Sequence, residues 1–170
     1  IRWRKSWQNG ELIIMQKVQR YFLEIIFQGQ KKIDFNLIYQ PNISFIKVQD
    51  FKVNKYFYKE IGADHFWRDR LIWTDKEWLK YINNKNLTTW AIKNENELIG
   101  FYEKEFHVDK NEIELINLGI LKKFRGQKLG STLLKHAIKN SFEYKSNRMW
   151  VHTCSLDHKF ALNNYMSKGF

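Results

Sequence analysis

A strand, a basic turn and a helix follow one another in the middle of the sequence, and this order constrains the fold most. The strand carries Ile113, Leu115, Leu118 and Ile120, and helical spacing joins Leu129, Leu133, Leu134, Ala137 and Ile138. The free N–H groups and the dipole at a helix N-terminus both favour an anion. Because Arg125, Lys122, Lys123 and Lys128 add positive charge there, we expect the turn to bind a phosphate or pyrophosphate.

The composition predicts one globular domain. The chain has 170 residues, and its contents of 44% hydrophobic and 16% aromatic residues argue against disorder. No apolar run approaches the roughly 18 residues that a membrane span needs, and no apolar signal-peptide region follows the charged N-terminus. The single cysteine, Cys154, excludes an internal disulfide framework and predicts a reducing, cytoplasmic location.

The net charge of +11 raises the question of a nucleic-acid partner. The lysines are spread along the chain and form no dense run, so we do not expect nucleic acid to be the main partner. A basic surface would also attract a polyanionic cofactor. A nucleic-acid-binding protein therefore stays an alternative, and it predicts strongly salt-dependent binding.

The N-terminal half predicts strands and then a pair of helices. We expect strands at residues 21–27, 33–40 and 43–50, and helices at 55–61 and 75–83. Asn54 would cap the first helix, and Thr74 with Glu77 forms a capping-box pattern before the second. Trp67 and Trp73 either pack these helices onto the core or line an acceptor pocket.

The C-terminal half predicts an antiparallel meander followed by a crossover. Strands at residues 87–93, 98–106 and 112–121 are joined by short polar turns. Helix 129–141 should return the chain to a strand at 148–153, parallel to the third strand of the meander. Asp157 would cap a last helix at about 158–168.

Two motifs in this order resemble the GNAT superfamily of N-acetyltransferases. They are the turn Arg125-Gly126-Gln127-Lys128-Leu129-Gly130-Ser131 and the helix His158-Lys159-Phe160-Ala161-Leu162-Asn163-Asn164-Tyr165-Met166-Ser167-Lys168-Gly169-Phe170. The stretches 21–24 and 66–70 are similar to an uncharacterised bacterial subgroup. The resemblance implies an α/β fold with a mixed, mostly antiparallel sheet and a central parallel β-α-β unit.

The resemblance also implies a single GNAT domain over residues 1–170. Its parts would be an N-terminal strand extension, a helical hairpin with the antiparallel meander, and an acetyl-CoA-binding turn with a helix, a strand and the final helix. These parts would span residues 1–42, 43–121 and 122–170.

The function implied by the resemblance is acetyl transfer from acetyl-CoA to a primary amine, without a metal. The pantetheine arm would bind Leu118, Gly119, Ile120 and Leu121, and the pyrophosphate would bind Arg125, Gly126, Gln127, Lys128, Leu129, Gly130 and Ser131. Tyr165 stands at the position of the usual acid. We choose Glu114 as the base, with Glu24 and Asp69 as weaker candidates. Small amines, aminoglycosides, amino acids, peptide N-termini and protein lysines all fit as acceptors.

The sequence departs from the superfamily pattern in three places. Lys128 replaces a glycine, and a positive φ there would cost about 1 kcal/mol or more. His158 replaces an asparagine. The two strands that normally follow the Gly-Phe pair are absent, so we expect an unfinished sheet edge that the partner in a homodimer could fill.

Other chemistries are less well supported by the sequence. His152 and Cys154 share a strand face, but no third group can be assigned to a Cys/His nucleophile. The spacing of His152, Cys154, Asp157 and His158 matches no recurrent zinc site. A regulatory module that binds acyl-CoA without turnover is the third functional alternative.

Overall fold

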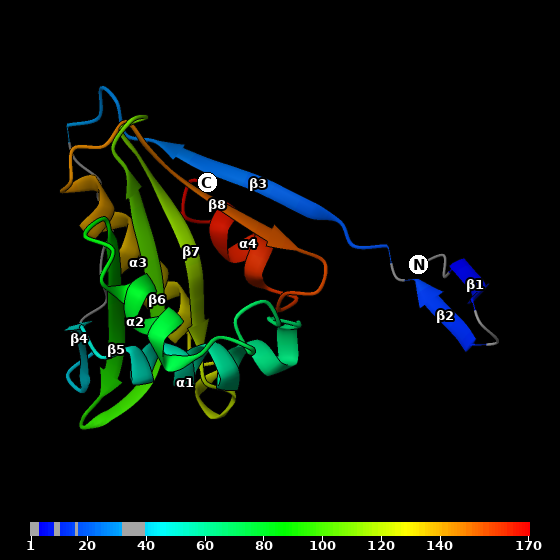
Figure 1. Ribbon diagram of the computed structural model, residues 1–170. Helices are drawn as coiled ribbons and strands as arrows, with labels where there is room; N and C mark the ends of the chain where they lie inside the picture. The colour runs from blue at the N-terminus through cyan, green and yellow to red at the C-terminus, as the bar shows by residue number, and fades with distance from the viewer. Residues whose placement is uncertain (1–3, 9–10, 16, 32–39) are drawn as a thin grey trace.

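The computed structural model describes residues 4–8, 11–15, 17–31 and 40–170, which form a mixed sheet with helices on both faces (Figure 1). The six-stranded sheet has the order β3-β8-β7-β6-β5-β4. Its strands are β3 (Arg20–Ile26), β4 (Ile43–Val48), β5 (Leu87–Asn94), β6 (Glu97–His107), β7 (Glu112–Ile120) and β8 (Arg148–Cys154). All pairs are antiparallel except β7 with β8. This is the predicted mixed sheet with a parallel β-α-β unit.

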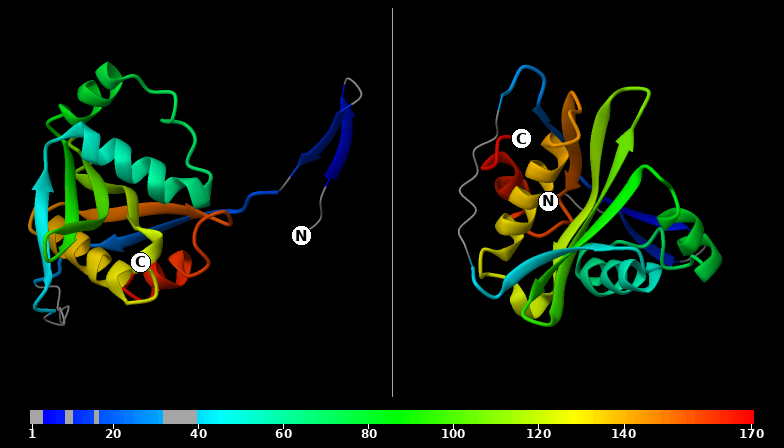
Figure 2. Two further views of the ribbon diagram at one scale, coloured as in Figure 1. Left: turned by 90° about the horizontal axis from the view of Figure 1, so that it is seen from below. Right: turned by 90° about the vertical axis from the view of Figure 1, so that its left-hand side faces the viewer.

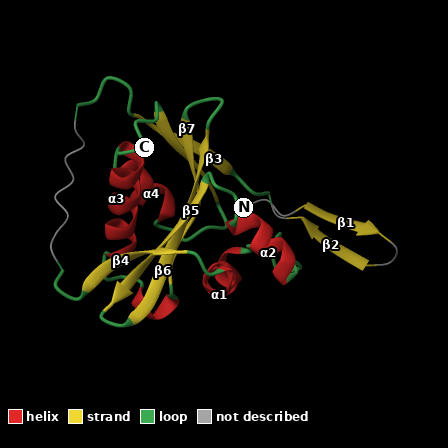
Figure 3. Ribbon diagram, turned by 60° about the vertical axis from the view of Figure 1, so that its left-hand side comes forward, coloured by secondary structure: helices red, strands yellow, loops and turns green. Residues whose placement is uncertain are grey.

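The helices cover the two faces of the sheet (Figures 2 and 3). One face carries α1 (Phe51–Gly62), the 3-10 turn η1 (Ala63–His65) and α2 (Asp75–Ile82). The other carries α3 (Leu129–Phe142) and α4 (Ala161–Met166), and η2 (Lys122–Phe124) precedes α3. The larger core lies on the α3 side, and a smaller core joins Phe57 and Ile61 of α1 to Phe101 of β6.

A separate two-stranded hairpin of β1 (Arg4–Gln8) and β2 (Glu11–Met15) precedes the sheet. It stands apart from the main sheet (Figures 1 and 2). The predicted strand at residues 33–40 lies almost entirely outside the described residues.

Local signals located most of the other elements. The Thr74 hydroxyl accepts a hydrogen bond from the Glu77 N–H at 3.3 Å, and the Glu77 carboxylate accepts from the Thr74 N–H at 2.7 Å. The predicted capping box is therefore present at the start of α2. The meander and the parallel crossover are confirmed as well.

Two predicted helix caps are wrong. Helix α1 begins at Phe51, because the Asp50 carboxylate accepts from the Lys52 N–H at 2.9 Å and caps it earlier. Asn54 is therefore inside the helix and buried. Asp157 does not cap α4, because its carboxylate accepts from the Thr153 hydroxyl and the Cys154 N–H instead.

The sheet edge beside β8 is not unfinished. Strand β3 pairs antiparallel with β8 along its whole length, from Arg20 opposite Cys154 to Ile26 opposite Arg148. Ile25 is buried in the core, and Arg148 donates to Glu24 across the pair. The N-terminal extension of the same chain thus occupies the edge for which we expected an additional strand.

The one parallel pair of the sheet is short. Residues 112–115 of β7 pair with residues 148–151 of β8, and the pairing ends there. The register of β6 against β7 also shifts at this level, so that Glu103 faces Asn117, Lys104 faces Leu115, and Ile116 is the extra residue of a bulge. A bulge bends its strand and re-aims the side chains beyond it. Strand β7 therefore separates from β8 past Leu115, and this separation opens the site.

Candidate active site

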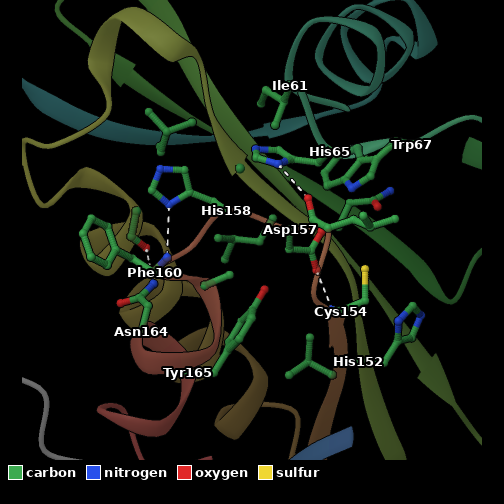
Figure 4. Close-up of a pocket in the computed structure, with 18 of the residues that line it drawn as sticks. Ile61, His65, Trp67, His152, Cys154, Asp157, His158, Phe160, Asn164 and Tyr165 are labelled. Carbon is green, nitrogen blue, oxygen red and sulfur yellow. Dashed lines mark hydrogen bonds between the residues drawn. The ribbon is translucent and has the colours of Figure 1, made fainter. Parts of the chain in front are cut away.

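A cavity of about 810 Å³ lies where β7 and β8 separate (Figure 4). Its walls come from these two strands, the end of α1 with η1, the turn before α3, and α4. Of the predicted cofactor-binding residues, those that line it are Leu118, Gly119, Ile120, Arg125, Gly126, Lys128, Leu129, Gly130 and Ser131. The predicted acid Tyr165 also lines it, whereas Leu121, Gln127 and Glu114 do not. Leu121 is instead packed in the smaller core.

The turn before α3 presents a row of free backbone donors. Within the described part of the chain, the N–H groups of residues 126–130 donate to no protein acceptor. Gly126 has φ +83°, and no atom lies within 4 Å of where a Cβ would be. Consecutive N–H groups beside a helix N-terminus bind anions well. The turn therefore has the backbone geometry to hold a pyrophosphate.

The backbone angle φ at Lys128 decides whether its replacement of glycine causes strain. It has φ +61° and stands immediately before α3. This left-handed conformation costs a residue with a Cβ about 1 kcal/mol or more. Lys128 therefore has the positive φ whose cost the sequence raised, and its side chain is exposed at the cavity.

Arg125 ties the turn to the opposite wall. Its Nε donates to the Ile120 carbonyl at 3.1 Å, and its Nη1 donates to the Asp64 carboxylate at 2.9 Å. The hydrogen bond from Arg125 and the charge of Lys122 hold the pKa of Asp64 below its ordinary value. The Arg125 Nη2 is buried and has no partner among the described residues.

Tyr165 extends from α4 with its hydroxyl directed into the cavity (Figure 4). The residue is 8% exposed, and burial, with a smaller contribution from Asp157, raises the pKa of the phenol above the ordinary value. The phenol is therefore protonated at neutral pH and can donate a proton. Helix α4 is joined to the turn by a hydrogen bond from the Asn164 amide to the Gly130 carbonyl at 3.4 Å.

The structure does not bring Glu114 together with Tyr165. Glu114 lies on the part of β7 that still pairs with β8, and its carboxylate bonds to His107 Nε2 at 3.0 Å. Glu24 binds Arg148 outside the cavity. Asp69, the other weak candidate, is exposed at the cavity wall. The role of Glu114 as the base stays a prediction, and its position does not favour it.

A buried polar network behind the cavity was missed by the sequence analysis. The fully buried Glu103 accepts hydrogen bonds from Asn54 Nδ2 at 2.6 Å, Arg70 Nη1 at 3.0 Å, Tyr81 Oη at 3.0 Å and Asn117 Nδ2 at 2.6 Å. Arg70 and Asn117 both line the cavity. A glutamate at position 103, within the apolar strand of residues 98–106, was the available signal, but its partners come from four other segments.

Trp67 and Trp73, whose roles the sequence left open, differ in their position relative to the cavity. Trp67 lines the cavity and also packs against Tyr58 and Phe101. Trp73 packs against Trp78 and Tyr81 of α2 and does not line the cavity. The pocket interpretation therefore suits Trp67, and the packing interpretation suits Trp73.

The polar residues at the end of β8 also face the cavity. His152, Cys154, Asp157 and His158 all line it (Figure 4). No group of three His, Cys, Asp or Glu side chains within the described ranges is arranged to hold a metal ion.

A model of the acetyltransferase (GNAT) family matches residues 54–170 of the sequence, which is more than half of the chain. The chain belongs to this family. No curated protein matches the sequence significantly. Family membership supports acetyl transfer in general, and proteins of the family generally use acetyl-CoA.

Solved structures share the fold of this GNAT protein at low identity. An aminoglycoside acetyltransferase from an uncultured soil metagenomic sample is 15% identical, with a TM-score of 0.63 over 75% of this chain and 87% of its own. A GCN5-related N-acetyltransferase from Sphaerobacter thermophilus is 11% identical, with a TM-score of 0.66 over 88% of this chain and 47% of its own. The ribosomal-protein-S18-alanine N-acetyltransferase from Escherichia coli is 15% identical, with a TM-score of 0.58 over 75% and 76%.

The described helices give no membrane-spanning candidate. None of those in the residues that the structure covers is both long enough and apolar enough to cross a bilayer.

Proposed function

We propose that this protein transfers the acetyl group of acetyl-CoA to a primary amine by direct attack of the amine on the thioester. The observation that carries the proposal is the row of free N–H groups at residues 126–130, which opens into the same cavity as Tyr165. An anion site beside a buried proton donor suits a thioester cofactor with a pyrophosphate.

The pyrophosphate, the pantetheine arm and the thiolate of the cofactor would each contact one part of the site. The turn and Arg125 would hold the pyrophosphate, and the separated strand at Leu118, Gly119 and Ile120 would hold the pantetheine arm. Tyr165 would protonate the leaving thiolate, since its buried phenol keeps its proton at neutral pH. The expected metal-free reaction and cytoplasmic location stay predictions.

Isothermal calorimetry with acetyl-CoA tests the binding half of this proposal. Binding in the micromolar range is expected, and no heat at millimolar acetyl-CoA would contradict it. We also expect Arg125→Ala to weaken acetyl-CoA binding several-fold, because both the guanidinium and its hydrogen bond to Asp64 are lost.

A CoA-release assay tests the transfer half. The acceptor panel should contain sisomicin and an alanine-terminated peptide, because a solved neighbour was crystallised with sisomicin and another acetylates ribosomal protein S18 at alanine. We expect Tyr165→Phe to lower kcat by about 100-fold with little change in acetyl-CoA affinity. Tyr56→Phe, at an exposed position of α1, is the matched control. Binding without any release of CoA would favour the non-catalytic acyl-CoA module.

A further inference from the structure

We propose that His65 is the general base that takes the proton from the attacking amine. This inference rests on the proposed function and adds the group for which Glu114 is poorly placed. His65 is the last residue of η1 and lines the cavity. In Figure 4 its ring projects from the η1 side, and the Tyr165 hydroxyl points into the same cavity from α4.

The hydrogen bond of the His65 ring determines its tautomer. Its Nδ1 lies 3.4 Å from the carbonyl oxygen of Leu156. A carbonyl can only accept, so in the neutral ring Nδ1 carries the hydrogen and Nε2 keeps a lone pair. The distance is long, as catalytic hydrogen bonds often are before the substrate binds. Nε2 is thus the proton acceptor, and the ring is held from the opposite wall.

The other histidine beside His65 has the reverse arrangement. The rings of His65 and His158 lie perpendicular, with centroids 6.1 Å apart. His158 Nδ1 accepts from the Phe160 N–H at 3.4 Å, so its neutral ring carries hydrogen on Nε2 and can only donate from there. Burial, followed by the charges of Arg125 and His65, lowers the pKa of His158. His158 therefore presents a donor where His65 presents an acceptor.

Three other acidic and basic groups in or beside the cavity fit the role less well. One oxygen of Asp157 accepts both the Thr153 hydroxyl at 2.6 Å and the Cys154 N–H at 3.0 Å. Asp64, next to His65 on η1, is bonded to Arg125. His152 is exposed on β8, with its ring against Phe22, and no hydrogen bond within the described residues holds its tautomer.

The step balances with these two residues. The amine nitrogen attacks the thioester carbonyl carbon, the new C–N bond forms, and the C–S bond breaks. His65 Nε2 takes the proton that the nitrogen loses, and the Tyr165 hydroxyl gives its proton to the departing thiolate. The imidazolium and the phenolate then return to their neutral forms by exchange with solvent. The products are the amide and CoA as a thiol.

A direct test is to determine the tautomer of His65, which needs no amine substrate. Nitrogen-15 NMR of the labelled protein should show a neutral histidine with Nδ1 protonated and Nε2 bare, and this signal should be missing in His65→Asn. Finding Nε2 protonated on His65 overturns the proposal, whatever the enzyme binds.

The kinetic test uses His65→Asn, because its amide can still donate to the Leu156 carbonyl but cannot act as a base. We expect kcat/KM to fall about 100- to 1,000-fold at pH 7.5, the acidic limb of the pH profile to disappear, and added imidazole to restore part of the rate. The affinity for acetyl-CoA should change less than twofold. His107→Asn, which lies outside the cavity, should leave the rate and the profile unchanged.

The outcomes separate the two proposals. If His65→Asn keeps its acidic limb and at least a third of the rate, or if Glu114→Gln or His158→Asn removes the limb instead, then His65 is not the base and acetyl transfer still stands. If the wild-type protein does not bind acetyl-CoA, the proposed function and the base both fail.

Discussion

Glu103 is buried behind the part of the cavity wall that carries Arg70 and Asn117. We expect substitution of its carboxylate to destabilise this wall strongly. All four of its hydrogen-bond partners within the described residues donate to it, and Arg70, whose side chain is only 14% exposed, lies with its guanidinium against the rings of Trp73 and Tyr81. Removing one member of a buried ion pair leaves an uncompensated charge and costs about 3–5 kcal/mol. Glu103→Ala should lower the free energy of unfolding by that amount.

The volume-matched change Glu103→Gln separates charge from packing. Its amide N–H₂ would face donors from Asn54, Arg70 or Asn117, so we expect a loss of about 2–3 kcal/mol. Glu105→Gln is the control, because this half-buried neighbour has one hydrogen bond, from Asn84, and should lose less than about 1 kcal/mol.

Urea unfolding followed by tryptophan fluorescence measures the free energy of unfolding of each variant, since the chain has seven tryptophans. A double-mutant cycle with Arg70→Met completes the test. The double variant should lose less stability than the two single variants together, because no buried charge is left unpaired. Glu103→Gln within about 0.5 kcal/mol of wild type at an unchanged m-value, or strict additivity with Arg70→Met, would refute the reasoning.

Three further perturbations test other parts of the structure. Lys128→Gly should raise the free energy of unfolding by about 0.5–1 kcal/mol by relieving φ +61°, whereas Lys128→Ala keeps the strain, so equal urea midpoints would contradict this. Gly119→Ala should lower Tm and cost about 1–3 kcal/mol, because the new Cβ would lie 2.4 Å from Cγ2 of Ile61; an unchanged Tm would contradict it. Burial lowers the pKa of Lys104 from 10.5 to about 7, so the unfolded chain binds more protons between these values and stability should rise with pH, by at most about 1.4 kcal/mol per unit. Urea unfolding between pH 7 and 9.5 should show this rise, and Lys104→Met should flatten it; parallel profiles would exclude Lys104 as the cause.

Local signals in the sequence determined much of the chain by themselves. The capping box at Thr74 and Glu77 and the run from β7 through the turn to α3 depend on residues a few positions apart, whose spacing encodes their hydrogen bonds and buried faces. The anion-binding turn and Tyr165 on the last helix could be predicted for the same reason. Even the possible strain at Lys128 could be anticipated, because a glycine position was visibly filled by another residue.

Only the tertiary structure decided which distant segments meet. Glu24 and Arg148, 124 positions apart, come together because β3 occupies the edge of β8, which no periodicity of either strand specifies. The bulge at Ile116 opens the strands only beyond Glu114, so the predicted base falls outside the cavity. The lone pair of His65 is likewise set by a carbonyl 91 positions away. Side-chain chemistry can be read from a sequence, but its direction depends on which strand edges and helix ends pack together.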